Sequence, residues 1–158
     1  IQKPMPNFAH SRLQTYLVVL LYQFLAQAHL GEVLTEWRCI FGPAGQERVF
    51  VPDLVVVTNE RLPIGDARDS PYLYTAPDLA IEILSPGQSA KRFADKVHFY
   101  LLHGVRLLWV IDPEDETVLI LKPGEDSVTL TIADILDGGD LFPGFRAPVA
   151  DLFARLRA

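Results

Sequence analysis

The chain has 158 residues, of which 49% are apolar and 22% are charged, and this composition is typical of a globular protein rather than a disordered one. Cys39 is the only cysteine, which excludes an intrachain disulfide and a zinc site built from several cysteines. The formal net charge of −6 argues against a broadly basic nucleic-acid-binding protein, although it does not describe any single face.

A first helix is predicted over residues 11–29, where apolar residues recur at the i, i+3, i+4 spacing of an amphipathic helix. Ser11 is the expected N-cap and Gly31 the expected C-terminal stop. The most apolar run, 16–26, is interrupted by Gln23 and is much shorter than the ~20 residues that a membrane span needs. The sequence therefore predicts a protein without a membrane segment, and the single thiol fits the reducing cytoplasm.

Two extended segments follow at 33–41 and 49–57, separated by a Gly-Pro-Ala-Gly turn at 42–45 that is typical of a hairpin. A loop of about twenty residues comes next, and loops of this length in a compact domain are usually functional or mobile. Residues 78–85 form a third predicted strand, and a second helix is expected over 89–103, ending at Gly104.

Strands are also expected at 106–112 and 117–122, paired with each other, and near 128–132, with a short helix near 149–157. The order of helices and strands predicts an α/β fold in which a central mixed β-sheet is flanked by helices, with an additional C-terminal β-hairpin region. No repeat, low-complexity tract or linker divides the sequence, so we expect a single domain over 1–158.

Two acidic residues, Asp53 and Glu82, stand inside separate apolar strands. If Val57 lies opposite Leu79 in an antiparallel pair, Asp53 falls opposite Ile83 and beside Glu82, with backbones about 5 Å apart. At that spacing two carboxylates can share one hard cation, which prefers oxygen ligands. Alone, Glu82 could equally point to solvent or pair with a structural arginine, but two acids that converge favour a site.

Asp78 and Lys96 are the other charged candidates. Asp78 precedes Glu82 by four residues, which is roughly 13 Å along a strand, so a cap or turn role suits it better than sharing the metal. Lys96 flanks the inward stripe of the second helix, four residues before Tyr100, and could reach over the sheet to stabilise anionic oxygen or activate water. On helix geometry alone a solvated surface lysine is the more common role for Lys96, and a core position is the more common role for Tyr100.

Other catalytic patterns are weak or missing. The sequence contains no P-loop, no G-x-G-x-x-G, no H-E-x-x-H and no G-x-S-x-G motif. The four histidines, His10, His29, His98 and His103, show no convincing ligand spacing. A Ser/His hydrolase is therefore disfavoured.

The ordered series of motifs resembles the Uma-type family of restriction endonucleases, a branch of the PD-(D/E)xK nuclease superfamily. The resemblance extends from the first helix to the Leu-Phe-Pro-Gly-Phe segment at 141–145, over nearly the whole chain. Its motifs are Val-Pro-Asp at 51–53, Pro-Asp-Leu-Ala-Ile-Glu-Ile-Leu-Ser-Pro at 77–86, Asp-Lys at 95–96 with Tyr100, Gly-Val at 104–105, and Trp-Val-Ile-Asp-Pro at 109–113.

The resemblance implies a restriction-endonuclease-like core and a site for Mg²⁺ (or Mn²⁺). It assigns metal binding to Asp53, Glu82 and the backbone carbonyl of Ile83, and catalysis to Asp53, Glu82 and Lys96, with Asp78 and Tyr100 as secondary candidates. Leu84 stands where the superfamily has a lysine, and the resemblance implies that Lys96 on the second helix takes over that role.

Three functions are open at this point. The first is hydrolysis of phosphodiester bonds in nucleic acid, DNA in the first instance, by a homodimer of the kind that cuts both strands. The second is a catalytically inactive module of the same fold that binds nucleic acid or a partner, which the acidic charge and Leu84 favour. A toxin or mobile-element component with a protein partner is the third.

Overall fold

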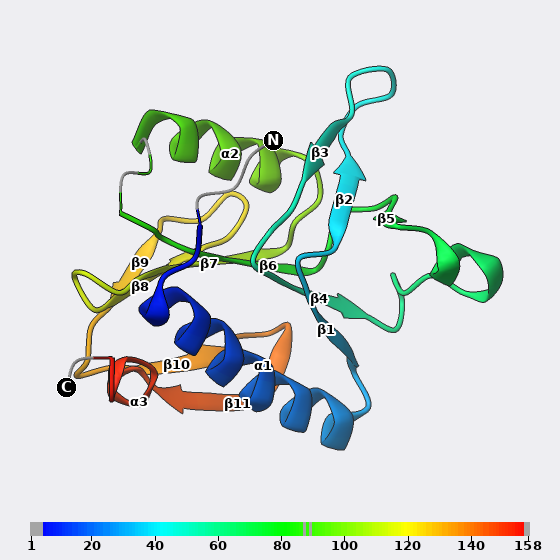
Figure 1. Cartoon of the computed structure of the whole chain (residues 1–158). Helices are drawn as coiled ribbons and strands as arrows, with labels where there is room; N and C mark the ends of the chain where they lie inside the picture. The colour runs from blue at the N-terminus through cyan, green and yellow to red at the C-terminus, as the bar shows by residue number, and fades with distance from the viewer. Residues whose placement is uncertain (1–4, 87, 89, 157–158) are drawn as a thin grey trace.

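A mixed β-sheet separates two layers of helices and smaller sheets in the computed structural model (Figure 1). The structure describes residues 5–86, 88 and 90–156, and no side chains are described for 90–92. Its helices are α1 (Phe8–Ala28), the 3-10 helix η1 (Gly65–Asp69), α2 (Ala90–Leu102) and α3 (Val149–Phe153).

Six strands of the described chain form the central sheet, and two smaller sheets lie beside it. In spatial order the central strands are β1 (Gly31–Thr35), β4 (Leu54–Thr58), β6 (Leu79–Ile83), β7 (Leu107–Asp112), β8 (Thr117–Leu121) and β9 (Val128–Leu130). The second sheet contains β3 (Arg48–Phe50), β2 (Arg38–Phe41) and β5 (Tyr72–Leu73), and the C-terminal hairpin contains β10 (Ile135–Gly138) and β11 (Phe142–Pro148). The predicted mixed α/β sheet with helices and a C-terminal hairpin is thus confirmed.

The first helix packs on the sheet through one stripe, whose buried members are His10, Leu13, Leu17, Leu21 and Leu25. It begins earlier than predicted, because the side chain of Asn7 rather than Ser11 accepts the hydrogen bond from a first-turn amide. It ends at Ala28, and its C-cap is His29 in the left-handed conformation rather than Gly31. Gly31 instead opens β1, where a Cβ atom would lie 2.3 Å from the carbonyl oxygen of Val57.

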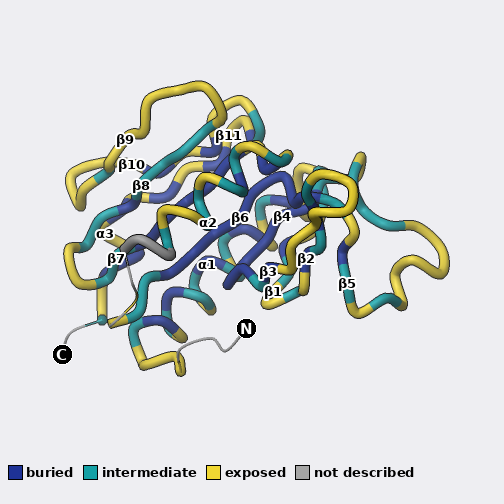
Figure 2. The backbone as a smooth tube through the Cα atoms, turned by 90° about the horizontal axis from the view of Figure 1, so that it is seen from above, coloured by how far each residue is buried: buried dark blue, intermediate teal, exposed yellow. Residues whose placement is uncertain are grey.

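The strands β4, β6 and β7 are buried on both faces, which explains why their sequences are continuous apolar runs rather than alternating ones. They form the dark centre of the tube in Figure 2. One face packs against α1, α3 and the β10–β11 hairpin. The other face packs against α2 and the β2–β3–β5 sheet.

The predicted register between the strands that carry the acids is wrong by one residue. Leu79 pairs with Val56 rather than with Val57, and the ladder ends at Leu54 opposite Ile81. Continued by one step, the observed register would set position 53 opposite position 82 instead of opposite Ile83. The ladder ends before Asp53, however, and the side chain of Asp53 reaches β6 by accepting a hydrogen bond from the amide of Ile83, next to Glu82.

The two long extended segments are each divided between two sheets. The first breaks at Glu36, which takes a positive φ of 51°, and the second breaks around Pro52 and Asp53 before β4 starts at Leu54. The β2–β3 hairpin turns at the predicted Gly-Pro-Ala-Gly segment. Strand β5, which the sequence did not predict, arises from the long loop and pairs in parallel with β2.

Candidate active site

Asp53 lies directly before β4, where the chain passes from the β2–β3–β5 sheet to the central sheet, and 4% of its surface is exposed. Its Oδ2 accepts a hydrogen bond of 2.8 Å from the backbone N–H of Ile83, and its Oδ1 lies 3.1 Å from Nε2 of His10. The Asp53 carbonyl accepts from Nε2 of Gln14 at 3.0 Å and from the amide of Glu36 at 3.3 Å. Helix α1, the β1–β2 turn and β6 therefore all hold this one residue.

Glu82 occupies the interior of β6, opposite Val110 of β7, and is also 4% exposed. Its Oε1 lies 2.7 Å from Nζ of Lys96 and accepts a hydrogen bond of 2.9 Å from the hydroxyl of Tyr100. Both partners come from α2, where they are four residues apart and so share one face. In the described part of the chain, no partner for Oε2 of Glu82 is found.

The electrostatics of the site centre on Glu82. Burial raises the pKa of Glu82, Lys96 lowers it, and the nearby carboxylate of Asp53 raises it. The pKa of Tyr100 is raised well above its usual value by burial and then by Glu82, so the phenol stays protonated as a donor. Burial and then Glu82 raise the pKa of Cys39 to about 12. The site thus holds more negative charge than its described ammonium groups offset.

Asp78 does not join the pair. It is fully buried at the start of β6, where its Oδ2 accepts a hydrogen bond of 2.7 Å from the amide of Thr58. Its Oδ1 lies 3.0 Å from Arg106 and 3.4 Å from Arg61. These contacts tie β6, the loop after β4 and the start of β7 together.

His10 contacts Asp53, which the sequence did not predict. The spacing between histidines indicates pairs of ligands and carries no information about a single histidine. The available signal was position, because His10 precedes Leu13 by three residues and so continues the buried stripe of α1. A polar residue on a buried stripe is a candidate for a partner.

The donor set fits a hard divalent cation. Asp53 and Glu82 supply carboxylate oxygens, and Lys96 and Tyr100 both contact Oε1 of Glu82 rather than Oε2. Burial raises the pKa of Glu82, and the Asp53 carboxylate raises it further, so a bound cation would stabilise the ionised form. Among the described residues, no group of three or more His, Cys, Asp or Glu side chains is assembled as a metal site. Two carboxylates completed by backbone and solvent oxygens match the way Mg²⁺ is usually held.

A groove of about 620 Å³ opens where β6 ends, directly after the site residues. Leu84 and Ser85 line it from the β6 end, Phe93 from α2, and Asn7 from the start of α1. Leu84 stands where the nuclease superfamily pattern has a lysine, and its side chain is half-buried at this groove. Two of its lining residues, Leu84 and Ser85, follow Glu82 by two and three positions.

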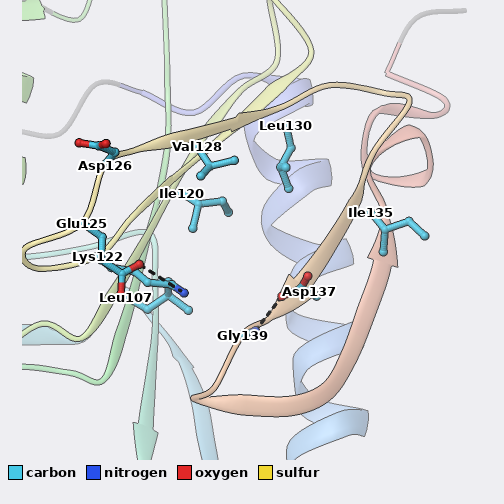
Figure 3. Close-up of a pocket in the computed structure, with 10 residues that line it drawn as sticks. All are labelled: Leu107, Ile120, Lys122, Glu125, Asp126, Val128, Leu130, Ile135, Asp137 and Gly139. Atoms are coloured by element: carbon cyan, nitrogen blue, oxygen red, sulfur yellow. Dashed lines mark hydrogen bonds and ion pairs between the residues drawn. The ribbon is translucent and has the colours of Figure 1, made fainter.

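A second pocket lies away from these residues, between the β8–β9 hairpin and the β10–β11 hairpin (Figure 3). It has a volume of about 190 Å³ and is lined by Leu107, the first residue of β7. Glu82 pairs with Val110, three residues further along the same strand. Its lining contains none of the predicted site residues.

A comparison with known families matches residues 1–150 to Uma2, a family described as "Putative restriction endonuclease". The chain belongs to the Uma2 family. A crystal structure of a "putative nuclease belonging to DUF820" from Anabaena variabilis is 29% identical and has a TM-score of 0.86. The match covers 97% of this chain and 84% of that one. No curated protein matches.

Membership in Uma2 confirms the resemblance and supports a nuclease as the class of activity. None of the helices that the structure describes is long and apolar enough to cross a membrane. In this Uma2 chain, Asp53 is bonded to the amide of Ile83, and Glu82 contacts Lys96 and Tyr100 of α2. Asp78 instead contacts Arg61 and Arg106.

Proposed function

We propose that this chain is a metal-dependent endonuclease that hydrolyses phosphodiester bonds, with DNA as its substrate and Mg²⁺ or Mn²⁺ as its cofactor. The observation that carries the proposal is that Asp53, bonded to the amide of Ile83, and its sequence neighbour Glu82 are both buried acids, with an ammonium group 2.7 Å from Glu82. A fold would gain stability from apolar residues at these positions, so buried acids there point to function.

Asp53 and Glu82 would hold the cation through their carboxylates, with the backbone carbonyl of Ile83 as a third ligand. When bound, the cation supplies Lewis-acid stabilisation of the charge that develops on the phosphate. Lys96, whose side chain is 24% exposed, can reach both Glu82 and a phosphate placed at the mouth of the site. Its ammonium would stabilise the developing negative charge and orient the attacking water.

Tyr100 has a supporting role in this proposal. Its hydroxyl donates to the same oxygen, Oε1, that Lys96 approaches, and the ring is fully buried. The two donors therefore hold Oε1 of Glu82 and would leave Oε2 available to a cation. Asp78, held by Arg61 and Arg106, would maintain the sheet and take no part in the reaction.

The test is cleavage of supercoiled plasmid, single-stranded DNA and RNA with Mg²⁺ or Mn²⁺, and with EDTA as the metal-free control. Asp53→Asn and Glu82→Gln should each abolish metal-dependent cleavage while circular dichroism shows the fold intact. Asp134→Asn, an exposed residue that caps a turn through Thr131, is the matched control and should cleave like wild type. Undiminished cleavage in both site variants would contradict the assignment.

The competing function is a catalytically inactive module that binds nucleic acid. Leu84 in the usual lysine position and the net charge of −6 favour it. Calorimetric titration of Mg²⁺ and Mn²⁺ separates the two functions. The endonuclease requires metal binding, and this binding should be lost in Asp53→Asn and Glu82→Gln. We also propose that the protein is a homodimer, since two-fold pairing is the commonest assembly, and light scattering measures the oligomeric state directly. We propose the cytoplasm as its location.

A further inference from the structure

His10 is a buried polar residue whose imidazole contacts the Asp53 carboxylate. It lies in the first turn of α1 and is 6% exposed. Nε2 contacts Oδ1 of Asp53, and Nδ1, also buried, has no hydrogen-bond partner among the described residues. A histidine on the buried stripe of α1, with Nε2 held against a buried carboxylate, calls for an explanation beyond packing.

The distance between the two groups has a geometric meaning. Two ligand atoms about 2.1 Å from one octahedral ion, at right angles to each other, are about 3.0 Å apart. Nε2 of His10 and Oδ1 of Asp53 are 3.1 Å apart, which matches one edge of such an octahedron. The imidazole could therefore bind the ion that Asp53 binds with little movement of the ring.

The neighbouring polar residues are committed elsewhere. The amide of Gln14 is directed at the backbone carbonyl of Asp53, not at its carboxylate. Asp78 is engaged by Thr58 and two arginines. Among the described residues, His10 faces the Asp53 carboxylate from α1.

We propose that His10 supplies Nε2 as a ligand to the cation held by Asp53 and Glu82, and that the site consequently prefers Mn²⁺ to Mg²⁺; this rests on the proposed metal site. Imidazole nitrogen binds first-row transition ions well, whereas Mg²⁺ strongly prefers oxygen ligands. In the bound form Nδ1 carries the imidazole proton and Nε2 presents its lone pair. Because no three-residue group is preassembled in the described chain, Glu82 closes the site by turning Oε2 to the ion.

The experiment titrates MnCl₂ and MgCl₂ calorimetrically into wild type, His10→Phe and His10→Gln, and records electron spin-echo modulation of bound Mn²⁺. Wild type should bind Mn²⁺ more tightly than Mg²⁺ and show modulation from a directly coordinated imidazole ¹⁴N. His10→Phe should lose at least about tenfold in Mn²⁺ affinity. The loss for Mg²⁺ should be smaller, and the nitrogen signal should vanish.

His10→Gln tests the main competitor, a role in positioning Asp53. Glutamine keeps an N–H donor for Asp53 but has no imidazole nitrogen. If His10 only positions Asp53, Gln restores both affinities and wild type lacks the nitrogen signal, which overturns the inference. His98→Phe, an exposed histidine on α2, is the matched control and should leave binding and signal unchanged.

The outcomes separate this inference from the proposed function. Binding of both ions that depends on Asp53 but shows no nitrogen coupling rejects the ligand role of His10 and leaves the endonuclease proposal standing. Binding of neither ion by wild type rejects both. Thermal melts of each variant establish that it is folded before the titrations are compared.

Discussion

Replacing Asp78 by alanine should destabilise the protein and leave its metal binding intact. The carboxylate is fully buried and connects three segments, through the amide of Thr58, Arg61 and Arg106. Alanine removes the acceptor, so the amide loses a hydrogen bond of 2.7 Å and two guanidinium groups lose a counter-ion. The contacts of Asp53 with Ile83 and of Glu82 with α2 do not involve Asp78 and remain.

The magnitude follows from these contacts. A hydrogen bond to a charged group contributes about 1.5–3 kcal/mol. The arginine side chains are 20% and 41% exposed, so solvent screens each pair and we assign each about 0.5–1 kcal/mol. Relief of the buried carboxylate's desolvation offsets part of the sum, and we expect a net loss of about 2–4 kcal/mol. For a domain of this size that lowers Tm by about 5–15 °C.

Urea unfolding followed by the fluorescence of the buried Trp109 measures this loss. Asp78→Asn keeps an acceptor for Thr58 without the charge and should lose about half as much. Asp134→Ala, at an exposed turn, is the control and should cost less than about 1 kcal/mol. A loss below about 1 kcal/mol in Asp78→Ala, or a normal stability with metal binding abolished, would refute the structural role.

Three further predictions concern the site. Since the pKa of Glu82 is raised, its protonated form favours the fold; that contribution is complete below the ordinary glutamate pKa and is lost as pH rises through the raised value. Glu82→Gln should therefore gain stability relative to wild type between acidic and neutral pH in urea titrations, and a gap that stays constant with pH would contradict the shift. Cys39, with a pKa of about 12 and no exposure, should react with a thiol reagent at pH 8 only after unfolding, whereas rapid reaction of the native protein would refute its burial. Lys96→Met should lose metal-dependent cleavage, and adding Leu84→Lys should restore part of it; no recovery in the folded double variant would argue against interchangeable lysine positions.

The central layer could be predicted from the sequence because its signals are strong. Apolar runs identify β4, β6 and β7, whose burial on both faces leaves no alternation to read. The stripe of α1 likewise follows directly from its spacing. The acids were conspicuous for the same reason, since Asp53 and Glu82 interrupt runs that are otherwise apolar.

The register and the sheet breaks could not be predicted, because they depend on single residues. Pairing ends at Leu54, so Asp53 leaves the ladder and its side chain, not its backbone, bonds to the amide of Ile83. The positive φ of Glu36 divides β1 from β2, and a non-glycine residue in that conformation gives no sequence signal. A two-residue strand such as β5 is equally invisible to periodicity.

The position of the lysine shows what the fold keeps when the sequence pattern changes. Residues two apart on a strand share a face, so a lysine at position 84 would lie on the face of β6 that carries Glu82. Helix α2 packs on that same face, and its buried Tyr100 sets the rotation of the helix. Lys96, one turn earlier, is thereby directed to Oε1 of Glu82. The ammonium group beside Glu82 thus comes from α2 instead of β6. The site requires a lysine side chain at this position in space, and not a lysine at a fixed spacing in the sequence.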